Sequence, residues 1–357
     1  MIYFLSAYFS FAPIWTQVTT QGFAVRSITQ DNSCPAPMTL RASPSADFPV
    51  TVCELELPHN TSQAGPIAII GDTGCHKKQD CNDNTQWPLK TILDNIASAK
   101  PSLIIHVGDY VYRQDYNWAT WKADFFDPAA SMLSQTPWLF MRGNHELCDR
   151  GGQGWFRFFD PRPYTETCSD YTDPYTVNYA GLNLLVMDNA AVTDSPDPAD
   201  ENSAQIYAKQ FETARDWKAD WLLIHEPIWG VVPNKKKPKI MNPTLQEAFK
   251  SAPAGIQFVL SGHIHLSQTL NFKDNLPAQM ITGMGGTRLD KELGDTSDIK
   301  FQDRHGLKIH SLSQFGHMLV SPTSTGAVFE QRGLDNQVIQ RFVLQGNQLH
   351  RDKHEEL

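Results

Sequence analysis

The 357-residue sequence lacks several features that would each have placed it in a particular class of protein. It has no internal repeats, no heptad pattern and no low-complexity tract. No apolar run is long enough for a transmembrane helix, so we expect no membrane span. Positive charge is also in short supply, because 30 Lys and Arg residues stand against 39 Asp and Glu residues and give a formal net charge of -9. This balance argues against a protein that coats nucleic acid or anionic membranes.

Charged residues are absent altogether from the first 24 positions. The apolar part, from Ile2 to Trp15, is too short to span a membrane but fits the hydrophobic core of a signal peptide. Gly22-Phe23-Ala24 offers a cleavage site with small residues at both ends, although the usual basic N-terminal region is missing. We expect residues 1–24 to be a signal peptide and the protein to be secreted or periplasmic.

Six cysteines are present, and none of them forms a C-x-x-C pair. A structural zinc–thiolate site is therefore a weaker interpretation than disulfides, which imply an oxidising compartment. Six cysteines allow fifteen connectivities. Pairing each cysteine with its sequence neighbour predicts the disulfides Cys34–Cys53, Cys75–Cys81 and Cys148–Cys168.

Short apolar runs alternate with helical stretches from residue 65 onward. The predicted strands are 67–70, 103–107, 138–141, 182–187, 221–224 and 256–260, and the predicted helices are 88–99, 118–134, 203–217 and 244–251. This alternation indicates a layered α/β domain. Residues 25–65 carry apolar segments broken by proline and are expected to form a short strand-rich lead-in, whereas the span 149–167 is expected to be a polar loop.

Five of the predicted strands end in a polar cluster, and such strand ends are where α/β sheets gather their ligands. The clusters offer two carboxylates, an amide, a phenol and several imidazoles, which suit hard or borderline cations rather than copper(I). We therefore predict a metal site built from Asp72, Asp109, Tyr112, Asn144, His225, His263 and His265. His106 lies inside an apolar strand and is expected to be a hydrogen-bonded core residue instead.

The series GDTG, GDYVY, GNHE, LLIH and GHIH resembles the calcineurin-like metallophosphoesterases. More narrowly, it is similar to the purple acid phosphatase pattern GDxG, GDxxY, GNH(D/E), VxxH and GHxH, with Leu222 in place of the usual valine. Tyr112 carries the narrower resemblance, because relatives that cleave cyclic nucleotides usually lack it. The resemblance implies a four-layer αββα sandwich with one catalytic domain at 66–330, followed by a C-terminal strand and tail at 331–357.

The resemblance also implies a role for each residue of the predicted site. Fe(III) would be held by Asp72, Tyr112 and His265, and Asp109 would bridge to a second ion. That ion, Fe(II), Zn or Mn, would be held by Asn144, His225 and His263. His145 would contact the phosphate and protonate the leaving oxygen, and Glu146 would orient His145 or a ligand. Tyrosinate bound to Fe(III) would make the protein purple.

This arrangement implies hydrolysis of small phosphate monoesters at acidic pH. Two cations would clamp the phosphate and lower the pKa of a bound water, and the resulting metal-bound hydroxide would attack phosphorus. A phosphodiesterase or nucleotide hydrolase on the same metals is the nearest alternative. The alternative of another class is a metal-binding or phosphate-binding protein without catalytic activity.

One expected substrate contact is missing from the sequence. Family members often carry a further histidine shortly after the VxxH motif, but no histidine lies between His225 and His263. Lysines at 235–237 and 239 occupy that interval, either as a solvated loop or as a group that attracts anionic substrate. Arg113 and Arg142 adjoin motif residues and are further candidates for phosphate contacts.

Overall fold

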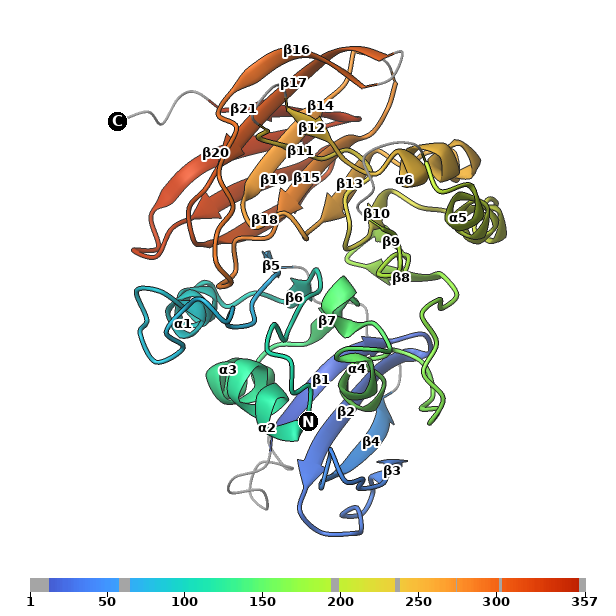
Figure 1. Cartoon of the computed structure of the whole chain (residues 1–357), viewed down its shortest axis with the longest axis vertical. Coiled ribbons are helices and arrows are strands. Elements are labelled where there is room, and N and C mark those ends of the chain that lie inside the picture. The colour runs from blue at the N-terminus through green and yellow to red at the C-terminus, as the bar shows by residue number, and fades with distance from the viewer. Residues whose placement is uncertain are drawn as a thin grey trace.

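The computed structural model describes residues 13–57, 65–193, 199–234, 238–273, 275–301 and 304–352. Two large sheets with helices beside them make up the molecule, which is consistent with the predicted α/β class (Figure 1). Parts of the predicted signal peptide (1–12), lead-in (58–64) and tail (353–357) lie outside the described residues, as do the lysines at 235–237. No helix in the described ranges has both the length and the apolar character needed to cross a membrane.

The larger sheet has eleven strands and extends along the long axis of the molecule (Figure 1). Its neighbours β5, β6, β7 and β1 are parallel, and the remaining pairs are antiparallel. In spatial order the strands are β21 (Gln348–Arg351), β20 (Val338–Gln345), β19 (Gly326–Arg332), β18 (His317–Thr323), β5 (Ile67–Ile70), β6 (Leu103–His106), β7 (Trp138–Phe140), β1 (Ile14–Thr19), β2 (Gly22–Thr29), β4 (Thr51–Leu57) and β3 (Thr39–Ala42). The domain boundary expected at residue 330 falls inside β19, and β20 and β21 continue the same sheet.

The smaller sheet has eight strands, of which β15, β13, β10 and β9 are parallel neighbours. In spatial order the strands are β16 (Thr296–Phe301), β17 (Arg304–Leu312), β14 (Ser267–Asn271), β15 (Ala278–Thr282), β13 (Phe258–Ser261), β10 (Trp221–Leu223), β9 (Leu182–Val186) and β8 (Tyr175–Tyr179). A separate two-stranded hairpin pairs β11 (Val231–Val232) with β12 (Lys239–Ile240).

The four predicted helices are present, with small changes in their bounds. The α-helices are α1 (Leu89–Ala99), α2 (Trp118–Trp121), α3 (Asp127–Leu133), α4 (Gly152–Phe158), α5 (Glu201–Thr213) and α6 (Pro243–Ala248). The stretch predicted as one helix at 118–134 consists of α2, a π-helical turn (Lys122–Phe126) and α3. Short 3-10 turns cover Asn144–Glu146 and Phe249–Ser251.

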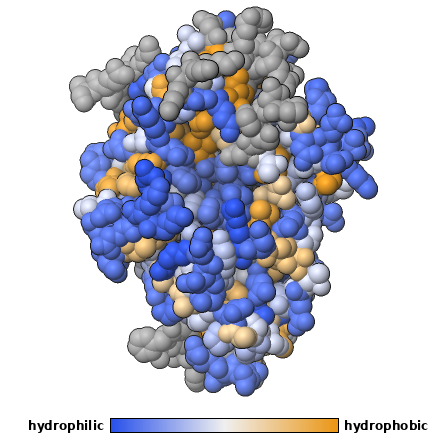
Figure 2. Space-filling model, in the orientation of Figure 1, coloured by the Kyte–Doolittle hydropathy of each residue, from blue (hydrophilic) through white to orange (hydrophobic). Residues whose placement is uncertain are grey.

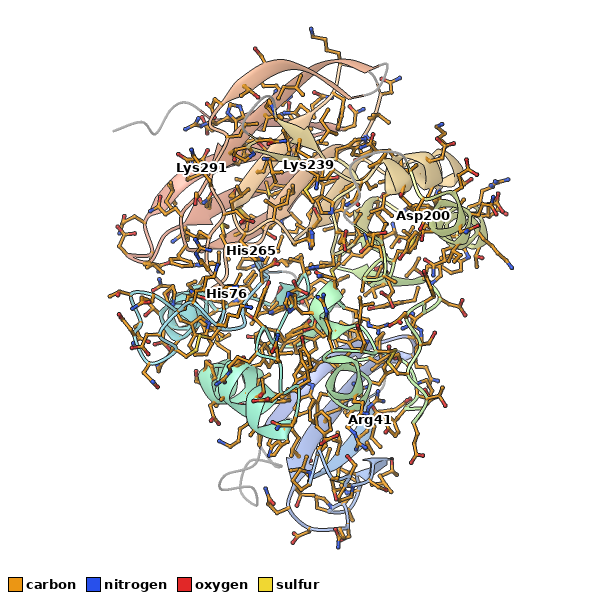
Figure 3. The ribbon with its side chains drawn as sticks, in the orientation of Figure 1. Arg41, His76, Asp200, Lys239, His265 and Lys291 are labelled. Atoms are coloured by element: carbon orange, nitrogen blue, oxygen red, sulfur yellow. A yellow bond between two sulfur atoms is a disulfide. The ribbon has the colours of Figure 1, made fainter. Side chains whose placement is uncertain are left out.

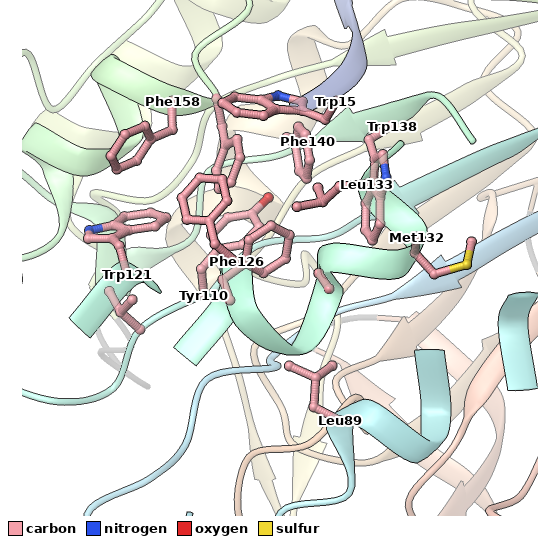
Figure 4. Close-up of a cluster of buried hydrophobic side chains, with 14 of the residues drawn as sticks. Trp15, Leu89, Tyr110, Trp121, Phe126, Met132, Leu133, Trp138, Phe140 and Phe158 are labelled. Carbon is pink, nitrogen blue, oxygen red and sulfur yellow. The ribbon is translucent and has the colours of Figure 1, made fainter. Parts of the chain in front are cut away.

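Three hydrophobic clusters hold these elements together. Phe126 and Trp138 belong to a cluster between the larger sheet and α1 to α4 (Figure 4). Ile105 and Leu223 belong to a second cluster between the two sheets, and Phe211 to a third between the smaller sheet, α5 and α6. Because both faces of the parallel strands are covered, the sequences of β5, β7 and β10 are apolar at every position rather than at alternate ones.

The N-terminal strands differ from the expectation of a leader that ends at Ala24. β1 lies between β7 and β2 in the larger sheet, and Trp15 packs against Phe126 and Phe159 (Figure 4). Cleavage after Ala24 would remove β1 and cut β2. An uncharged, mostly apolar strand has the same composition as the core of a signal peptide, so composition alone does not separate the two.

The span between Cys148 and Cys168, expected to be a loop, contains α4. Trp155 and Phe158 are three positions apart, which places them on one side of this helix, and both are buried in the first cluster. This span therefore forms a helix that packs into the core, and not the polar loop that was predicted. The three predicted disulfides are all formed, with Cys148–Cys168 closing the segment that contains α4.

Two buried arginines attach α4 to the N-terminal strands. Arg26 of β2 and Arg41 of β3 donate hydrogen bonds of 2.7–3.0 Å to backbone carbonyls at the C-terminal end of α4 and just beyond it. Positive charge is favourable at a helix C-terminus, where the last carbonyls lack partners within the helix. Glu54 of β4 forms ion pairs with Arg26 at 2.6 Å and with Arg41 at 3.2 Å. The accepting carbonyls belong to Phe156, Arg157, Phe158 and Asp160.

Replacing Glu54 with glutamine would leave two buried guanidinium groups without their shared counter-ion. Since removing one partner of a buried ion pair costs about 3–5 kcal/mol, and the Glu54 side chain is 17% exposed, we expect Glu54→Gln to lower the free energy of unfolding by about 2–4 kcal/mol. Urea denaturation measures this loss. The exposed Glu56 of the same strand supplies the control, because Glu56→Gln should change stability by at most about 0.5 kcal/mol.

The contribution of Glu54 to the free energy of unfolding should also depend on pH. Burial alone would raise the pKa of Glu54, but Arg26 and Arg41 lower it below its ordinary value of 4.5. A lowered pKa means that the stabilisation is complete above the unfolded-state pKa and is lost as the pH falls through the folded-state pKa. Below about pH 4.5 the wild type should therefore lose more stability than Glu54→Gln. Equal losses of stability in wild type and Glu54→Gln at low pH would contradict this explanation.

Candidate metal centre

The loops that follow five parallel strands meet where the two sheets lie against each other. β5, β6 and β7 come from the larger sheet, and β10 and β13 from the smaller one. Hydrophilic residues cover the middle of the face shown in Figure 2, at the level where His265 and His76 lie in Figure 3. The predicted ligands that these loops bring together are Asp72, Asp109, Tyr112, Asn144, His225, His263 and His265.

One group of these side chains surrounds the phenolic oxygen of Tyr112. This oxygen lies 3.2 Å from Asp72 Oδ1, 3.0 Å from Asp109 Oδ2 and 3.1 Å from His265 Nε2. The side chains of Asp72, Asp109 and His265 also lie close enough to one another to share a single ion. The arrangement therefore offers four donor atoms to one position.

A second group surrounds the side-chain oxygen of Asn144. This oxygen lies 3.2 Å from His225 Nε2, 3.1 Å from His263 Nδ1 and 3.2 Å from Asp109 Oδ2. Asp109 Oδ2 also lies 3.4 Å from His225 Nε2. The two groups therefore share Asp109, as expected for a carboxylate between two ions.

The composition of the second group fits a bound cation. The amide oxygen of Asn144 faces only atoms that can accept hydrogen bonds or bind a metal. Ligand atoms that lie about 2.0–2.2 Å from one ion are about 2.8–3.6 Å apart in octahedral or tetrahedral arrangements, a range that includes these spacings. A cation between them would turn mutually unfavourable acceptors into ligands.

Burial and crowding shift the pKa values of the predicted ligands. Burial raises the pKa of Asp72 to about 7. Burial also raises the pKa of the Tyr112 phenol well above its ordinary value, and the carboxylates of Asp109 and Asp72 add to this shift. Burial would lower the pKa of His225, but Asp109 outweighs it and raises the pKa to about 10. A cation in this cluster would favour the ionised forms of Asp72 and Tyr112.

Three of the predicted ligands have an unusual backbone conformation. The φ angles of Asp72, Asp109 and His263 are 55°, 61° and 71°, in the left-handed region that residues other than glycine rarely adopt. Such strain concentrates at functional sites, where the surrounding structure enforces it. Gly143 is required for a related reason, because a Cβ atom at this position would collide with the Asp109 side chain.

Backbone carbonyls orient two of the imidazoles. His225 Nδ1 lies 2.7 Å from the carbonyl oxygen of Val107, and His265 Nδ1 lies 3.0 Å from that of Arg288. Each contact turns the Nε2 atom of its ring toward the other predicted ligands. Metal-binding histidines commonly use their second nitrogen in this way.

Glu146 acts on the backbone of the ligand loops rather than on the ring of His145. Its buried carboxylate accepts hydrogen bonds from the N–H groups of Asp109 at 3.0 Å, Tyr110 at 2.9 Å and Gly143 at 3.1 Å. Burial and the charge of Asp109 raise the pKa of Glu146 to about 8. Of the two roles expected for Glu146, the structure supports the orientation of a predicted ligand, Asp109.

His145 lies against both groups of predicted ligands. Its backbone N–H donates to Asp109 Oδ1 at 2.9 Å, and its ring lies 4.0 Å from the Tyr112 ring between centroids. The Nδ1 atom is buried and has no hydrogen-bond partner among the described residues. Burial, together with the positive charge of Arg150, lowers the pKa of His145 although Asp109 opposes the shift.

The prediction that Arg142 contacts phosphate is wrong. Its side chain is only 1% exposed and donates to the carbonyls of Glu146 at 2.8 Å and Ser169 at 2.6 Å. It also forms ion pairs with Asp188 at 3.2 Å and Asp170 at 3.3 Å. Arg142 therefore supports the loop after β7 from behind.

Arg113 is also engaged away from the predicted ligands. Its Nε lies 3.2 Å from Asp124 Oδ2, and Asp124 is fully buried in the π-helical turn. Burial raises the pKa of Asp124 to about 6, although Arg113 opposes the shift. Arg113 thus neutralises a buried carboxylate. His106, in contrast, is the core residue that was predicted, with Nε2 2.9 Å from Thr73 Oγ1.

Two side chains that the motifs do not include also lie at the site. The His76 ring lies 6.3 Å from the Tyr112 ring, in the loop closed by Cys75–Cys81 (Figure 3). Arg150 Nη1 lies 3.4 Å from the backbone oxygen of Asn144. Only their positions shortly after a motif distinguish these two residues in the sequence, and side-chain direction is not visible there.

Comparison with known proteins shows where this fold and these motifs recur. The model of the calcineurin-like phosphoesterase family matches residues 65–267. A purple acid phosphatase from yellow lupin (Lupinus luteus) seeds has a similar structure, with a TM-score of 0.59 and 14% identity over 94% of this chain and 74% of that one. GAP50, the anchor in the inner membrane complex of Plasmodium, has a TM-score of 0.50 and 15% identity over 79% of this chain and 89% of that one.

No curated protein sequence matches the chain. The two structural similarities, at such low identity, establish only a shared fold. The family match is more specific, because it covers more than half of the chain and contains all five predicted strand-end motifs. The chain belongs to the calcineurin-like phosphoesterase family.

Proposed function

We propose that the protein hydrolyses phosphate monoesters at a centre of two metal ions, and that it works best at acidic pH. The observation that carries this proposal is the division of seven donor side chains into two groups that share Asp109. A single structural ion would need only one of these groups. Two adjacent positions suit phosphate ester hydrolysis, in which both the attacking and the leaving oxygens need stabilisation.

The donor atoms suggest how the ions are distributed. The group around the Tyr112 phenol would hold Fe(III) with Asp72 and His265, because a phenolate is a suitable ligand for that ion. The group around the Asn144 amide would hold Fe(II), Zn or Mn with His225 and His263. When bound, the two cations would hold the phosphate oxygens, neutralise charge in the transition state and lower the pKa of water, Fe(III) more strongly than a divalent ion.

His145 is the proposed general acid. Its contact with Asp109 and its packing on Tyr112 hold the imidazole beside both groups of ligands. From this position a ring nitrogen can donate a proton to the leaving oxygen, a contribution on the order of 10²–10⁴-fold in rate. Glu146 keeps the Asp109 backbone in the strained conformation that points its carboxylate between the two groups.

We also propose a four-layer fold and a location outside the cytoplasm. The three hydrophobic clusters, each between a different pair of layers, support the four-layer αββα sandwich. The three disulfides, together with the absence of free cysteines among the described residues, support an extracellular or periplasmic location.

A function without catalysis is the second candidate. One observation favours it, namely the similarity to a structure described as an anchor in Plasmodium. A shared fold does not determine activity, because function depends on the residues of the site. Against this candidate, the chain retains all seven predicted ligands together with His145.

Asp109→Asn tests the two-metal centre. The neutral amide cannot bridge two cations as a carboxylate does. We expect elemental analysis to show fewer than two ions per chain, and turnover to fall by on the order of 10²-fold or more, since loss of even an outer partner of a metal ligand costs about 10–100-fold. The exposed Asp94 of α1 provides the control, because Asp94→Asn should keep both metal and activity. Unchanged turnover in Asp109→Asn would overturn the mechanism.

Tyr112→Phe tests the assignment of Fe(III). The wild type should be purple, with a long-wavelength absorption band from tyrosinate bound to Fe(III), and the variant should lose this band while it keeps its fold. The visible spectrum, with elemental analysis on the same samples, measures both. A wild type that contains two ions but has no such band would instead be a colourless zinc or manganese enzyme.

Matched esters decide between the alternative activities. p-Nitrophenyl phosphate and bis(p-nitrophenyl) phosphate release the same leaving group but differ in charge and bulk. We expect a higher kcat/KM for the monoester, because its additional ionised oxygen can interact with the cations of the site. A higher value for the diester would favour the phosphodiesterase alternative. Hydrolysis of neither ester by metal-loaded protein would favour the binding-protein candidate.

A further inference from the structure

We propose that Arg150 binds the phosphate group of the substrate and takes the place of the histidine that is missing after His225. This proposal rests on the proposed function, because it concerns the substrate of the same site. Arg150 belongs to the loop between the 3-10 turn that carries His145 and helix α4. The residue was not among the phosphate contacts expected from the sequence.

The first argument is the position of the guanidinium group beside Asn144. When the amide oxygen of Asn144 faces His225 and His263, as binding of a metal requires, its NH₂ group faces Arg150 Nη1 at 3.3 Å. Two hydrogen-bond donors thus point at each other. An anionic oxygen that lies beside both nitrogens would accept from both, and charge-assisted hydrogen bonds of this kind are among the strong ones in proteins.

The second argument is the charge balance around Arg150. No carboxylate among the described residues forms an ion pair with it, whereas Arg113 pairs with Asp124 and Arg142 with two aspartates. The other two arginines near the motifs thus have their charge matched within the protein. Arg150 retains a partly exposed positive charge beside the predicted metal ligands, where an anionic group of the substrate can use it.

The third argument is that the structure fixes the loop. The backbone N–H of Arg150 donates to the Leu147 carbonyl at 2.9 Å, and that of Gly151 donates to the His145 carbonyl at 2.9 Å. A Cβ atom at position 151 would lie only 2.9 Å from that carbonyl and 3.0 Å from Val111. The Cys148–Cys168 disulfide closes the segment. A pre-formed loop lowers the entropic cost of holding a long side chain against a ligand.

The same hydrogen-bonded loop also connects Arg150 to the proposed general acid, His145. His145 has a buried Nδ1 without a partner among the described residues, and Gly151, the residue after Arg150, donates its backbone N–H to the His145 carbonyl at 2.9 Å. A phosphate between the two residues would contact Arg150 through an oxygen that does not react and present its leaving oxygen to His145. Arg150 is therefore a substrate-binding residue, and it is not required to hold the metals.

The test compares wild type, Arg150→Gln and Arg150→Lys, each loaded with metal and checked by elemental analysis. Arg215→Gln is the control, because it removes the same charge from an exposed site on the surface. Two quantities are measured: the Kd of inorganic phosphate by calorimetric titration, and the KM and kcat for p-nitrophenyl phosphate. Losing hydrogen bonds to a charged group should raise the Kd and the KM of Arg150→Gln roughly 10- to 100-fold, with a smaller change in kcat.

The lysine variant keeps the charge but not the planar arrangement of donors, so its Kd and KM should fall between those of wild type and Arg150→Gln. Metal content should be unchanged in all variants. A Kd within twofold of wild type in Arg150→Gln, with both metals retained, would overturn the proposal. If Arg150→Gln does not fold, Arg150→Lys decides the question. Wild-type Kd and KM in Arg150→Lys would overturn a phosphate contact through the planar guanidinium group, whereas a raised Kd for phosphate would support that contact.

Failure of this proposal is distinct from failure of the proposed function. If wild type hydrolyses no ester, the proposed function fails, and the phosphate titration alone still decides the role of Arg150. If wild type hydrolyses the monoester and Arg150→Gln matches it in Kd and KM, only the arginine proposal fails.

Discussion

The buried carboxylate of Glu146 joins the two loops on which the rest of the site depends. Its three hydrogen bonds reach the backbone of Asp109, Tyr110 and Gly143, so the loop after β6 and the loop after β7 cannot move independently. Asp109 is the carboxylate that both groups of predicted ligands share, and Gly143 directly precedes Asn144. A displacement of either loop would therefore separate the two groups. Burial and the charge of Asp109 raise the pKa of Glu146, and the hydrogen bonds from these N–H groups offset part of that shift.

The two sheets hold the strained backbone of the site in its conformation. Asp72, Asp109 and His263 each adopt a left-handed conformation, at a cost of about 1–3 kcal/mol per residue. The strands that precede them are apolar on both faces and packed into different hydrophobic clusters, so the chain has no freedom to relax at these turns. This combination explains why the carboxylates of Asp72 and Asp109 stay close together in spite of their mutual repulsion. Metal binding would then relieve a repulsion that folding has imposed.

The sequence was most informative where the determinant is local. Runs such as residues 103–107, which are followed by Gly-Asp, identify both the strand and its functional end, and the seven predicted ligands converge in the structure. The sequence did not predict contacts that depend on the direction of a side chain. Arg142 and Arg150 stand on either side of the GNHE motif, but the first is directed into the protein toward Asp170 and Asp188, and the second toward Asn144. Adjacency in sequence to a motif does not reveal which carbonyls and carboxylates a long side chain will meet. The same limitation hid α4, whose aromatic residues find their partners in distant strands.

The N-terminal strands show how much contacts between distant segments add to what composition alone indicates. An uncharged apolar segment at the start of a chain has the composition of a leader, and only its neighbours in space identify it as a strand. β1 pairs with β7, the strand that leads into Asn144, and Arg26 and Arg41 of the adjoining strands hold the end of α4. α4 in turn follows the loop that carries His145 and Arg150. The N-terminal strands therefore support the loop after β7 from two directions, through the sheet and through the helix. Residues far from the metal ligands in sequence thus belong to the framework that positions them.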